Sequence, residues 1–390
     1  MPETTPAPIR VFHLQPGAGA QELPELPAAA PAQGFYWIAC TRPAFGAELA
    51  RLQALLQRVT GQQLVDLHVS DLLNAQLPSH YDYTTQYDLL VVRRLAQVQA
   101  DAAVPLPNQA RGGPPVLRRI DTSPVGFAVF DQLLLSVHPE DCGVRDAYAA
   151  RLVTPAAAPA TNGANAAEAM VRELRSGPVA GARLPTGPAD LMLRVVNHIV
   201  DRYLDLRREL SRQLDHWQIE LLRPHTRFAN WGALLDARLN LHRLDEVCED
   251  QRTAVRAWLD ALDNWTEPAD SAALRELDLL KVRSRDVLEH IERVVTHVRR
   301  LEHGIETAVQ MHFSVQGNRT NDIMRILTVI TAIFLPLNLI AAIFGMNFEF
   351  IPLVHQQDGF WWAMGAMGTI SAVLVALFWR KRYLARTGQG

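Results

Sequence analysis

Two long apolar runs dominate the C-terminal end of the chain. No charged residue occurs in 326–348 or in 359–379, so each run is longer than twenty residues. A helix of about 20 residues crosses the hydrocarbon core of a bilayer. A buried helix of a soluble protein is usually shorter and carries a polar face, whereas these runs are apolar almost all round. We therefore predict membrane helices at 323–344 and 360–379, joined by a loop at 345–359.

Basic residues after the second run set the expected orientation. Arg380, Lys381, Arg382 and Arg386 follow it directly, whereas the loop between the runs contains no Lys or Arg. Positively charged flanks remain on the cytoplasmic side of a membrane. The sequence therefore predicts a multi-pass protein of the plasma (bacterial inner) membrane, with both termini in the cytoplasm and a basic cytosolic tail at 380–390.

A seven-residue apolar repeat precedes the first membrane run. It lies on a predicted third helix that begins near Ser271, after the capping residue Asp270, and has no break before Pro336. The repeat indicates a stalk helix at 269–322 that packs along an apolar seam, as in a coiled-coil-like funnel. At 1.5 Å per residue, the segment to Phe344 would be ~110 Å long. With Ser284 as its weak position, the seam comprises Leu277, Leu280, Val287, Ile291, Val294, Val298, Leu301, Ile305 and Ala308.

Shorter hydrophobic segments in the first half predict a cytosolic α/β domain at 34–155. The strings FYWIAC, YDLLVVRRLAQV, VGFAVF and QLLLSVHP are typical of buried strands, and GAELARLQALLQRVTG of an amphipathic helix ending at Gly61. Residues 1–33, rich in Pro, Ala and Gly, are predicted to be poorly ordered. Residues 156–187 are expected to form a linker or insertion, and charged helical periodicity predicts a helical hairpin at 188–268. The expected fold class is an α+β membrane protein.

Polar side chains interrupt the first membrane helix along one face, where spacings of 3 and 4 residues place them on a single stripe with Leu327 beside it. An anchor helix has no use for such groups, because each must find a partner within the bilayer. If several copies surround an axis, the stripe lines a polar channel whose Met and Leu rings gate it by dewetting. Alternatively, the same groups bond across helix contacts in a simple dimer. The stripe consists of Asn321, Met324, Thr328, Thr331, Leu335, Asn338 and Ala342.

Composition removes several classes of function. With 38 Lys and Arg against 41 Asp and Glu, the chain has no excess positive charge for a nucleic-acid partner. Its three distant cysteines match neither a disulfide framework nor a zinc-ligand spacing. The sequence has no phosphate-binding glycine loop for ATP and no Ser/His/Asp or HExxH arrangement. We therefore predict that the protein is not an enzyme and carries no cofactor.

The triplet GMN at 345–347 resembles the signature of the CorA family of divalent-cation transporters. The similarity extends over NDIMRILTVITAIFLPLNLIAAIFGMNFEFIP and on to FWRKRYL, and more weakly over FYWIACTRP, VSDLLNAQLPSHYDYTTQYDLLVVRRL and VGFAVFDQLLLSVHPED. The resemblance implies a homopentamer whose first membrane helices line a central pore. It also implies that Gly345, Met346 and Asn347 form the pore entrance, and that the ion gradient and membrane potential drive transport.

The resemblance gives further residues an expected role. Asn347 would present its amide oxygen to Mg²⁺, which gives up water reluctantly and is therefore held through its hydration shell. Glu349 and Asp358 would concentrate cations at the entrance. Asp286 on the stalk is expected to bind a regulatory divalent cation between subunits, with acids of the N-terminal domain such as Asp82 and Asp88 as candidate partners; an ordinary surface salt bridge is the alternative.

Two other functions remain open. His355 in the loop would favour Zn²⁺, Ni²⁺ or Co²⁺ over Mg²⁺ if it bound the ion. A proton-coupled zinc transporter similar to the ZntB branch is thus the first alternative, although members of that branch tend to have GVN at the signature. A membrane-anchored coiled-coil scaffold, in which the two helices only tether a cytosolic oligomer, is the second.

Overall fold

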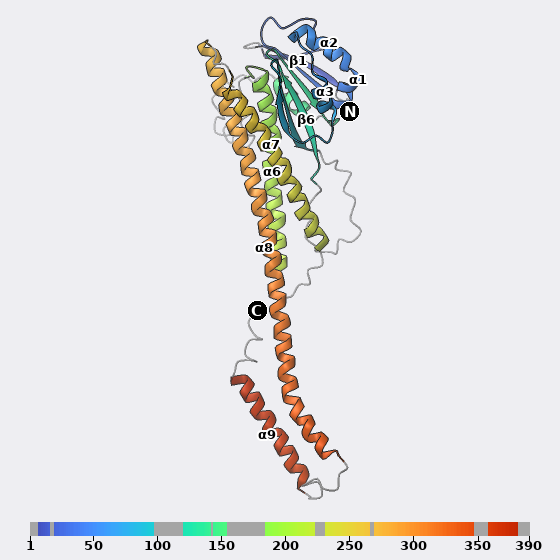
Figure 1. Cartoon of the computed structure of the whole chain (residues 1–390), viewed down its shortest axis with the longest axis vertical. Helices are drawn as coiled ribbons and strands as arrows, with labels where there is room; N and C mark the ends of the chain where they lie inside the picture. The colour runs from blue at the N-terminus through green and yellow to red at the C-terminus, as the bar shows by residue number, and fades with distance from the viewer. Residues whose placement is uncertain are drawn as a thin grey trace, which may run out of the picture. The chain divides into compact units, whose positions relative to one another are not determined.

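The chain forms two compact units (Figure 1). One comprises Met1–Asp215 and Asn230–His303, and the other comprises His216–Ala229 and Gly304–Gly390. The computed structural model describes residues 7–15, 19–96, 120–141, 143–153, 184–222, 231–265, 269–346 and 358–380.

A seven-stranded mixed sheet is the centre of the first unit. Its strand order is β2-β1-β3-β7-β6-β5-β4, and neighbouring strands are antiparallel except for the parallel pair β3 and β7. The four strands expected from the hydrophobic strings are present as β3, β5, β6 and β7. The strands are β1 Ile9–Gln15, β2 Gly19–Leu23, β3 Phe35–Thr41, β4 His80–Tyr83, β5 Asp88–Leu95, β6 Thr122–Val129 and β7 Leu133–His138.

The expectation that residues 1–33 are poorly ordered was wrong for the two strands that this segment contains. β1 pairs with β3 on one side and with β2 on the other, so it lies inside the sheet rather than at its edge. Val11, Phe12 and Leu14 are buried, with exposed fractions of 4%, 0% and 1%. The short apolar string of β1 was hidden in a segment whose overall composition is rich in Pro, Ala and Gly.

Three helices cover one face of the sheet and form the main hydrophobic core with it (Figure 1). They are α1 Arg42–Ala47, α2 Leu49–Thr60 and α3 Asp66–Leu73. Leu52, Leu55 and Leu56 of α2 are buried against Ile38 and other strand residues. The helix ends where predicted, because Gly61 adopts a left-handed φ of 74° that a residue with a Cβ would strain, and its N–H bonds the Gln57 carbonyl. Helices α1 and α3 were not expected from the sequence.

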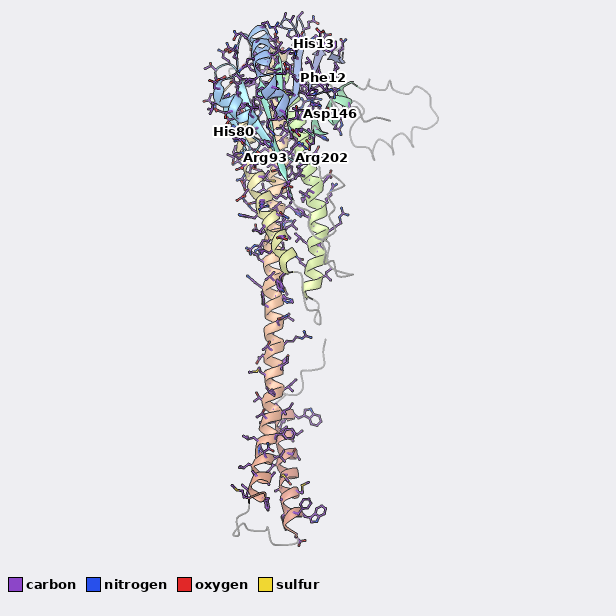
Figure 2. The ribbon with its side chains drawn as sticks, turned by 90° about the vertical axis from the view of Figure 1, so that its right-hand side faces the viewer. Phe12, His13, His80, Arg93, Asp146 and Arg202 are labelled. Atoms are coloured by element: carbon purple, nitrogen blue, oxygen red, sulfur yellow. The ribbon has the colours of Figure 1, made fainter. Side chains whose placement is uncertain are left out.

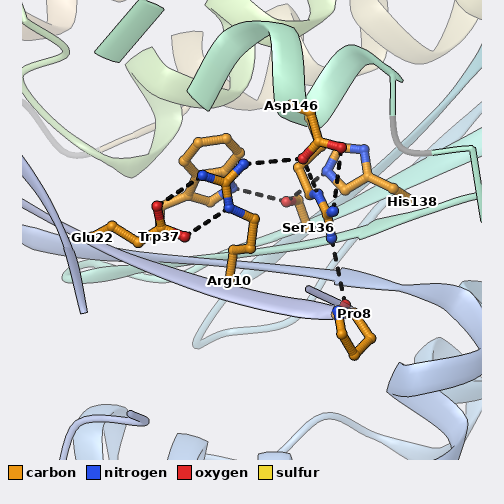
Figure 3. Close-up of polar contacts among 8 residues, drawn as sticks. Pro8, Arg10, Glu22, Trp37, Ser136, His138 and Asp146 are labelled. Atoms are coloured by element: carbon orange, nitrogen blue, oxygen red, sulfur yellow. Dashed lines mark hydrogen bonds and ion pairs between the residues drawn. The ribbon is translucent and has the colours of Figure 1, made fainter. Parts of the chain in front are cut away.

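Polar groups buried on the opposite face pair among themselves (Figure 3). The indole Nε1 of Trp37 donates to Ser136 Oγ at 2.8 Å, and His138 Nε2 lies 2.9 Å from the same oxygen. Burial lowers the pKa of His138 to about 3, and the nearby Arg145 guanidinium acts in the same direction. The imidazole is therefore neutral and serves as a packed, hydrogen-bonded core residue.

Helix α4 (Gly143–Val153) is attached to this face through charged groups (Figure 3). Arg10 of β1 donates to Glu22 of β2 at 2.7 and 2.8 Å and to Asp146 of α4 at 3.1 Å. The ring of Tyr148 packs edge-on against Trp37, with 6.1 Å between centroids. One guanidinium thus ties two strands and a helix together.

Three long helices follow: α6 Pro188–Leu222, α7 Trp231–Asp263 and α8 Ser271–Phe344. As the periodicity predicted, α8 runs without a break through Pro336. Arg283 of α8 pairs with Asp190 of α6, and Lys281 lies 3.0 Å from Asp263 at the end of α7. The stalk helix therefore packs against two helices of its own chain.

The predicted seam of α8 is buried. Ser284, its weak position, is 0% exposed because its Oγ accepts from Trp258 Nε1 of α7 at 3.1 Å and donates to the Leu280 carbonyl at 2.9 Å. Leu301 alone of the predicted positions is only half-buried. The buried apolar members are Leu277, Leu280, Val287, Ile291, Val294, Val298, Ile305 and Ala308.

In the second unit, α9 (Gly359–Arg380) runs beside the last part of α8 in both views (Figures 1 and 2). The predicted linker at 156–187 lies outside the described residues as far as residue 183, and the described chain from 184 leads into α6. The predicted basic tail lies outside them from residue 381.

Candidate functional site

The last part of α8 and the whole of α9 expose apolar side chains. In the most apolar stretch of α8 only 6% of residues are buried within the chain, and in the most apolar stretch of α9 none is. Contiguous apolar surface of this extent marks contact with a membrane or with other protein surfaces. Both helices are long and apolar enough to cross a bilayer.

All members of the predicted polar stripe on α8 are exposed in the single chain. Met324, Leu327 and Leu335 have exposed fractions of 60%, 57% and 68%, whereas Val329, away from the stripe, has 3%. Asn321, Thr328, Thr331, Asn338 and Ala342 are exposed as well. The stripe is therefore a continuous surface that the described chain leaves uncovered.

The two threonines of the stripe use their hydroxyl protons within the helix. Thr328 Oγ1 donates to the Met324 carbonyl at 2.7 Å, and Thr331 Oγ1 donates to the Leu327 carbonyl at 2.8 Å. Each oxygen keeps lone pairs that can accept a hydrogen bond from outside the helix. Both groups thus offer acceptors, which is the polarity that water molecules around a cation require.

Asn338 is the amide of the stripe that lies within the uncharged run of α8. Within the part of the chain that the structure describes, its exposed amide has no hydrogen-bond partner. Moving an unpaired amide from water into lipid costs several kcal/mol, because the amide loses its hydrogen bonds with water. The side chain must therefore face water or a polar group of another chain.

Helix α8 ends at the GMN triplet. The N–H of Gly345 bonds the Ala341 carbonyl at 2.9 Å, and a Cβ at Gly345 would lie 3.1 Å from that oxygen, so glycine suits the close backbone approach. Met346 is 52% exposed. Asn347 and Glu349 lie outside the described residues. Asp358 is exposed at the start of α9, where its carbonyl accepts from the N–H of Trp362 at 3.1 Å.

Helix α9 carries small side chains along one face and tryptophans near its ends. Gly368, Ala372 and Ala376 form a small-residue face at four-residue spacing, which permits close packing of a neighbouring helix. Thr369 donates to the Gly365 carbonyl at 2.8 Å, the same bond that the α8 threonines make. Trp361, Trp362 and Trp379 are exposed near the two ends, as in aromatic belts at membrane interfaces.

The stalk acid Asp286 is exposed and lies close to a histidine. Its Oδ1 lies 3.7 Å from His290 Nε2 on the next turn of α8. Its sequence neighbour Arg283 pairs instead with Asp190. Burial raises the pKa of Asp201 on α6; His290 opposes this rise and Asp286 adds to it, which places the two acids within electrostatic range.

The acids considered as partners for Asp286 have other contacts. Asp82 Oδ2 lies 3.1 Å from His68 Nε2, and Asp88 accepts from the Tyr81 hydroxyl at 2.5 Å. Among the described residues, no group of three or more His, Cys, Asp or Glu side chains is arranged to hold a metal ion. A cation at Asp286 would therefore need ligands beyond those that the described residues supply.

Sequence reasoning missed Asp201 as a neighbour of Asp286. The signal was present in the spacing of His198, Asp201 and Asp205, which puts them on one face of α6. The sequence does not show that α6 packs against α8, so it could not connect that face with Asp286, which lies 85 positions later.

Comparisons with known proteins identify the family of this chain. The family model described as "CorA-like Mg2+ transporter protein" matches residues 32–382. The cobalt/magnesium transport protein CorA of Thermotoga maritima is 34% identical over 100 residues, which are 26% of this chain and 28% of that protein. The match thus spans less than a third of this relative.

Two full-length solved structures share the fold. The CorA magnesium transporter from Methanocaldococcus jannaschii superposes with a TM-score of 0.66 at 17% identity, covering 97% of this chain and 98% of that one. The full-length CmaX protein gives a TM-score of 0.57 at 17% identity, with coverages of 96% and 97%. Since the family model covers nearly the whole sequence, this chain belongs to the CorA-like Mg²⁺ transporter family of membrane proteins, which is a family of transporters and not of enzymes.

Proposed function

We propose that this protein is a channel that conducts divalent cations, Mg²⁺ in particular, through a pore lined by α8 from several copies of the chain. The observation that carries the proposal is the unpaired amide of Asn338 within an apolar membrane-length helix. That amide shares a stripe with two threonines whose oxygens are free to accept hydrogen bonds. Such a stripe is costly in lipid and useful around a hydrated ion.

The pore is closed by apolar rings in this proposal. Met324, Leu327 and Leu335 are exposed on or beside the stripe and would meet their counterparts around the axis. A narrow apolar constriction expels water and so blocks a hydrated ion without a physical plug. Widening the helix ring would wet it. The homopentamer of the family resemblance is the assembly that we propose.

Ions enter through the GMN collar in this proposal. Asn347 amides bind the hydration shell of Mg²⁺ without removing it, which suits an ion that dehydrates reluctantly. Glu349 and Asp358 raise the local cation concentration. The membrane potential supplies the driving force, about 2.3 kcal/mol per elementary charge per 100 mV and thus roughly twice that for a divalent ion, with both termini in the cytoplasm.

Transport through this collar is tested in liposomes that contain the purified full-length protein. We expect Asn347→Ala to abolish Mg²⁺ flux under an inward-negative potential while the oligomer size is unchanged. Thr369→Val is the matched control, because it removes one exposed polar group from α9 and should transport normally. Normal flux in Asn347→Ala would contradict the pore entrance.

The same preparation separates the alternatives. Flux that responds to a pH gradient at fixed voltage and prefers Zn²⁺ would favour a proton-coupled zinc transporter. Absence of flux for Mg²⁺, Co²⁺, Ni²⁺ and Zn²⁺ alike would favour a membrane-anchored scaffold. Competition among these four ions in a single preparation ranks their affinities directly.

Gating by intracellular cations would act through Asp286. Its position within electrostatic range of Asp201 supports a site where a bound cation relieves repulsion between carboxylates, with further ligands from a neighbouring copy. Loss of the cation would let the stalks separate and shift the population toward open pores. We expect Asp286→Lys to weaken the dependence of flux on internal Mg²⁺. An unchanged dose response would mean that Asp286 is an ordinary surface acid without a role in gating.

A further inference from the structure

A large cavity lies in the first unit, where the sheet meets the ends of three helices. Its volume is about 960 Å³, which is at the upper end of the range for small-molecule sites. Its lining residues come from the β4–β5 and β6–β7 turns, the start of α6, the end of α7 and the first turns of α8. Neither the proposed pore nor the proposed gate uses this cavity.

The charges that line the cavity are mostly negative. Among the described residues that line it, six carry a carboxylate and a single one, Arg283, carries a cation, which is already paired with Asp190. Asp82 is paired with His68. Asp131, Asp260 and Glu276 are exposed, and in the described part of the chain none of the three forms an ion pair. The cavity therefore has an uncompensated negative charge.

One further feature of the cavity adds to this negative charge. The last turn of α7, which ends at Asp263, also lines the cavity, and its terminal carbonyls carry partial negative charge. The N-termini of α6 and α8 nearby are offset by Asp190, which accepts from the Thr186 N–H at 3.1 Å, and by Asp270, which accepts from the Ala273 N–H at 3.4 Å.

Aromatic rings line the same cavity. Tyr81 and Tyr83 stack with 6.1 Å between centroids, and Trp265 stands edge-on to the buried Trp258 at 5.9 Å. Tyr83 and Trp265 remain 68% and 40% exposed. Aromatic faces bind methylene chains and attract ammonium groups through cation–π interactions.

The spacing of the carboxylates selects the type of cation. Within the described residues no three acids or histidines are close enough to chelate a metal ion. Carboxylates that come from separate elements and line one cavity together with aromatic rings instead suit a cation whose charges are separated by an apolar chain. A linear polyamine has this structure.

We propose that this cavity binds a linear polyamine, with one ammonium group at Asp88 and Asp131, another at Asp260 and Glu276, and the methylene chain on Tyr83 and Trp265. The bound molecule would connect the sheet to the first turns of α8 within the first unit. This site is separate from the ion pathway, and its occupancy does not depend on transport.

Calorimetry on the full-length protein in detergent tests the proposal, with spermidine as the probe. We expect saturable binding of one molecule per chain that weakens as salt concentration rises. Asp131→Asn and Glu276→Gln should each weaken binding about threefold and their combination about tenfold, as for partly exposed ion pairs. Both side chains are exposed, so these variants keep the fold.

Matched controls distinguish this site from general charge effects. Glu25→Gln removes one exposed negative charge of the same unit outside the cavity and should leave spermidine affinity unchanged. Trp265→Leu keeps the charge and should weaken binding severalfold through the lost aromatic face. Wild-type affinity in the double variant would overturn the proposal. So would equal binding of 1,8-octanediol, or displacement of spermidine by Mg²⁺ at matched ionic strength with equal affinity.

Discussion

The stalk part and the membrane-length part of α8 both carry apolar side chains at helical spacing, but they differ in what covers these side chains. In the stalk, Val287 and Val298 are 2% and 0% exposed beneath helices of the same chain. Near the C-terminal end, Met324 and Leu335 are 60% and 68% exposed. The stalk seam is completed within one chain, whereas the membrane stripe needs lipid or further copies. One continuous helix therefore serves two different kinds of packing.

Polar residues sharpen this difference. Ser284 lies in the stalk seam with both of its hydrogen bonds made inside the chain. Asn338 lies on the membrane stripe with no partner among the described residues. A polar group that is satisfied internally stabilises a fold, while one left unpaired in an apolar helix is retained for contact with something outside it.

Placing an amide in the stalk seam is expected to have the largest effect. Val298→Asn would bury an amide without partners at a fully covered position, which costs about 3 kcal/mol or more of the free energy of unfolding. Thermal unfolding of the full chain in detergent, followed by circular dichroism, measures the loss. Val282→Asn is the matched control, because Val282 lies on the same helix and is 57% exposed. Equal melting temperatures for the two variants would contradict the buried seam.

Removing the amide from the membrane stripe should give the opposite pattern. We expect Asn338→Leu to lower Mg²⁺ flux ~10-fold or more, equivalent to about 1.4 kcal/mol in the transport barrier, while thermal stability stays the same or rises. Asn338→Gln keeps an amide and should retain part of the flux. Liposome flux and melting temperature are measured on the same preparations. Full activity of Asn338→Leu would mean that this face does not line the pore.

Periodicity and hydropathy were enough to predict the long helices, because each depends on residues close together in the sequence. The seam from Leu277 to Val298 and the apolar span around Pro336 were both read from spacing alone. The buried state of Ser284 followed from its pairing with Trp258, 26 positions away, which no local pattern contains.

Features built from distant segments could not be predicted in this way. Strand β1 is buried only because β2 and β3 flank it, and its segment is otherwise rich in Pro and Gly. The electrostatic influence of Asp286 on Asp201, and the cavity that both Asp131 and Glu276 line, depend on how α6, α7 and α8 pack. In each case the separate residues were visible, but the contact between them was not.

The smallest expected effect concerns the polar member of the stalk seam. Ser284→Ala removes the oxygen that accepts from Trp258 Nε1 and leaves a buried indole N–H without a partner, at a cost of about 1–2 kcal/mol. The melting temperature should fall by a few degrees, with flux unchanged. Ser314→Ala, at an exposed position of the same helix, is the control and should melt as the wild type does. If Ser284→Ala were as stable as Ser314→Ala, the seam would tolerate an unpaired polar group, and the contrast with Asn338 would no longer distinguish internal packing from a surface kept for ions.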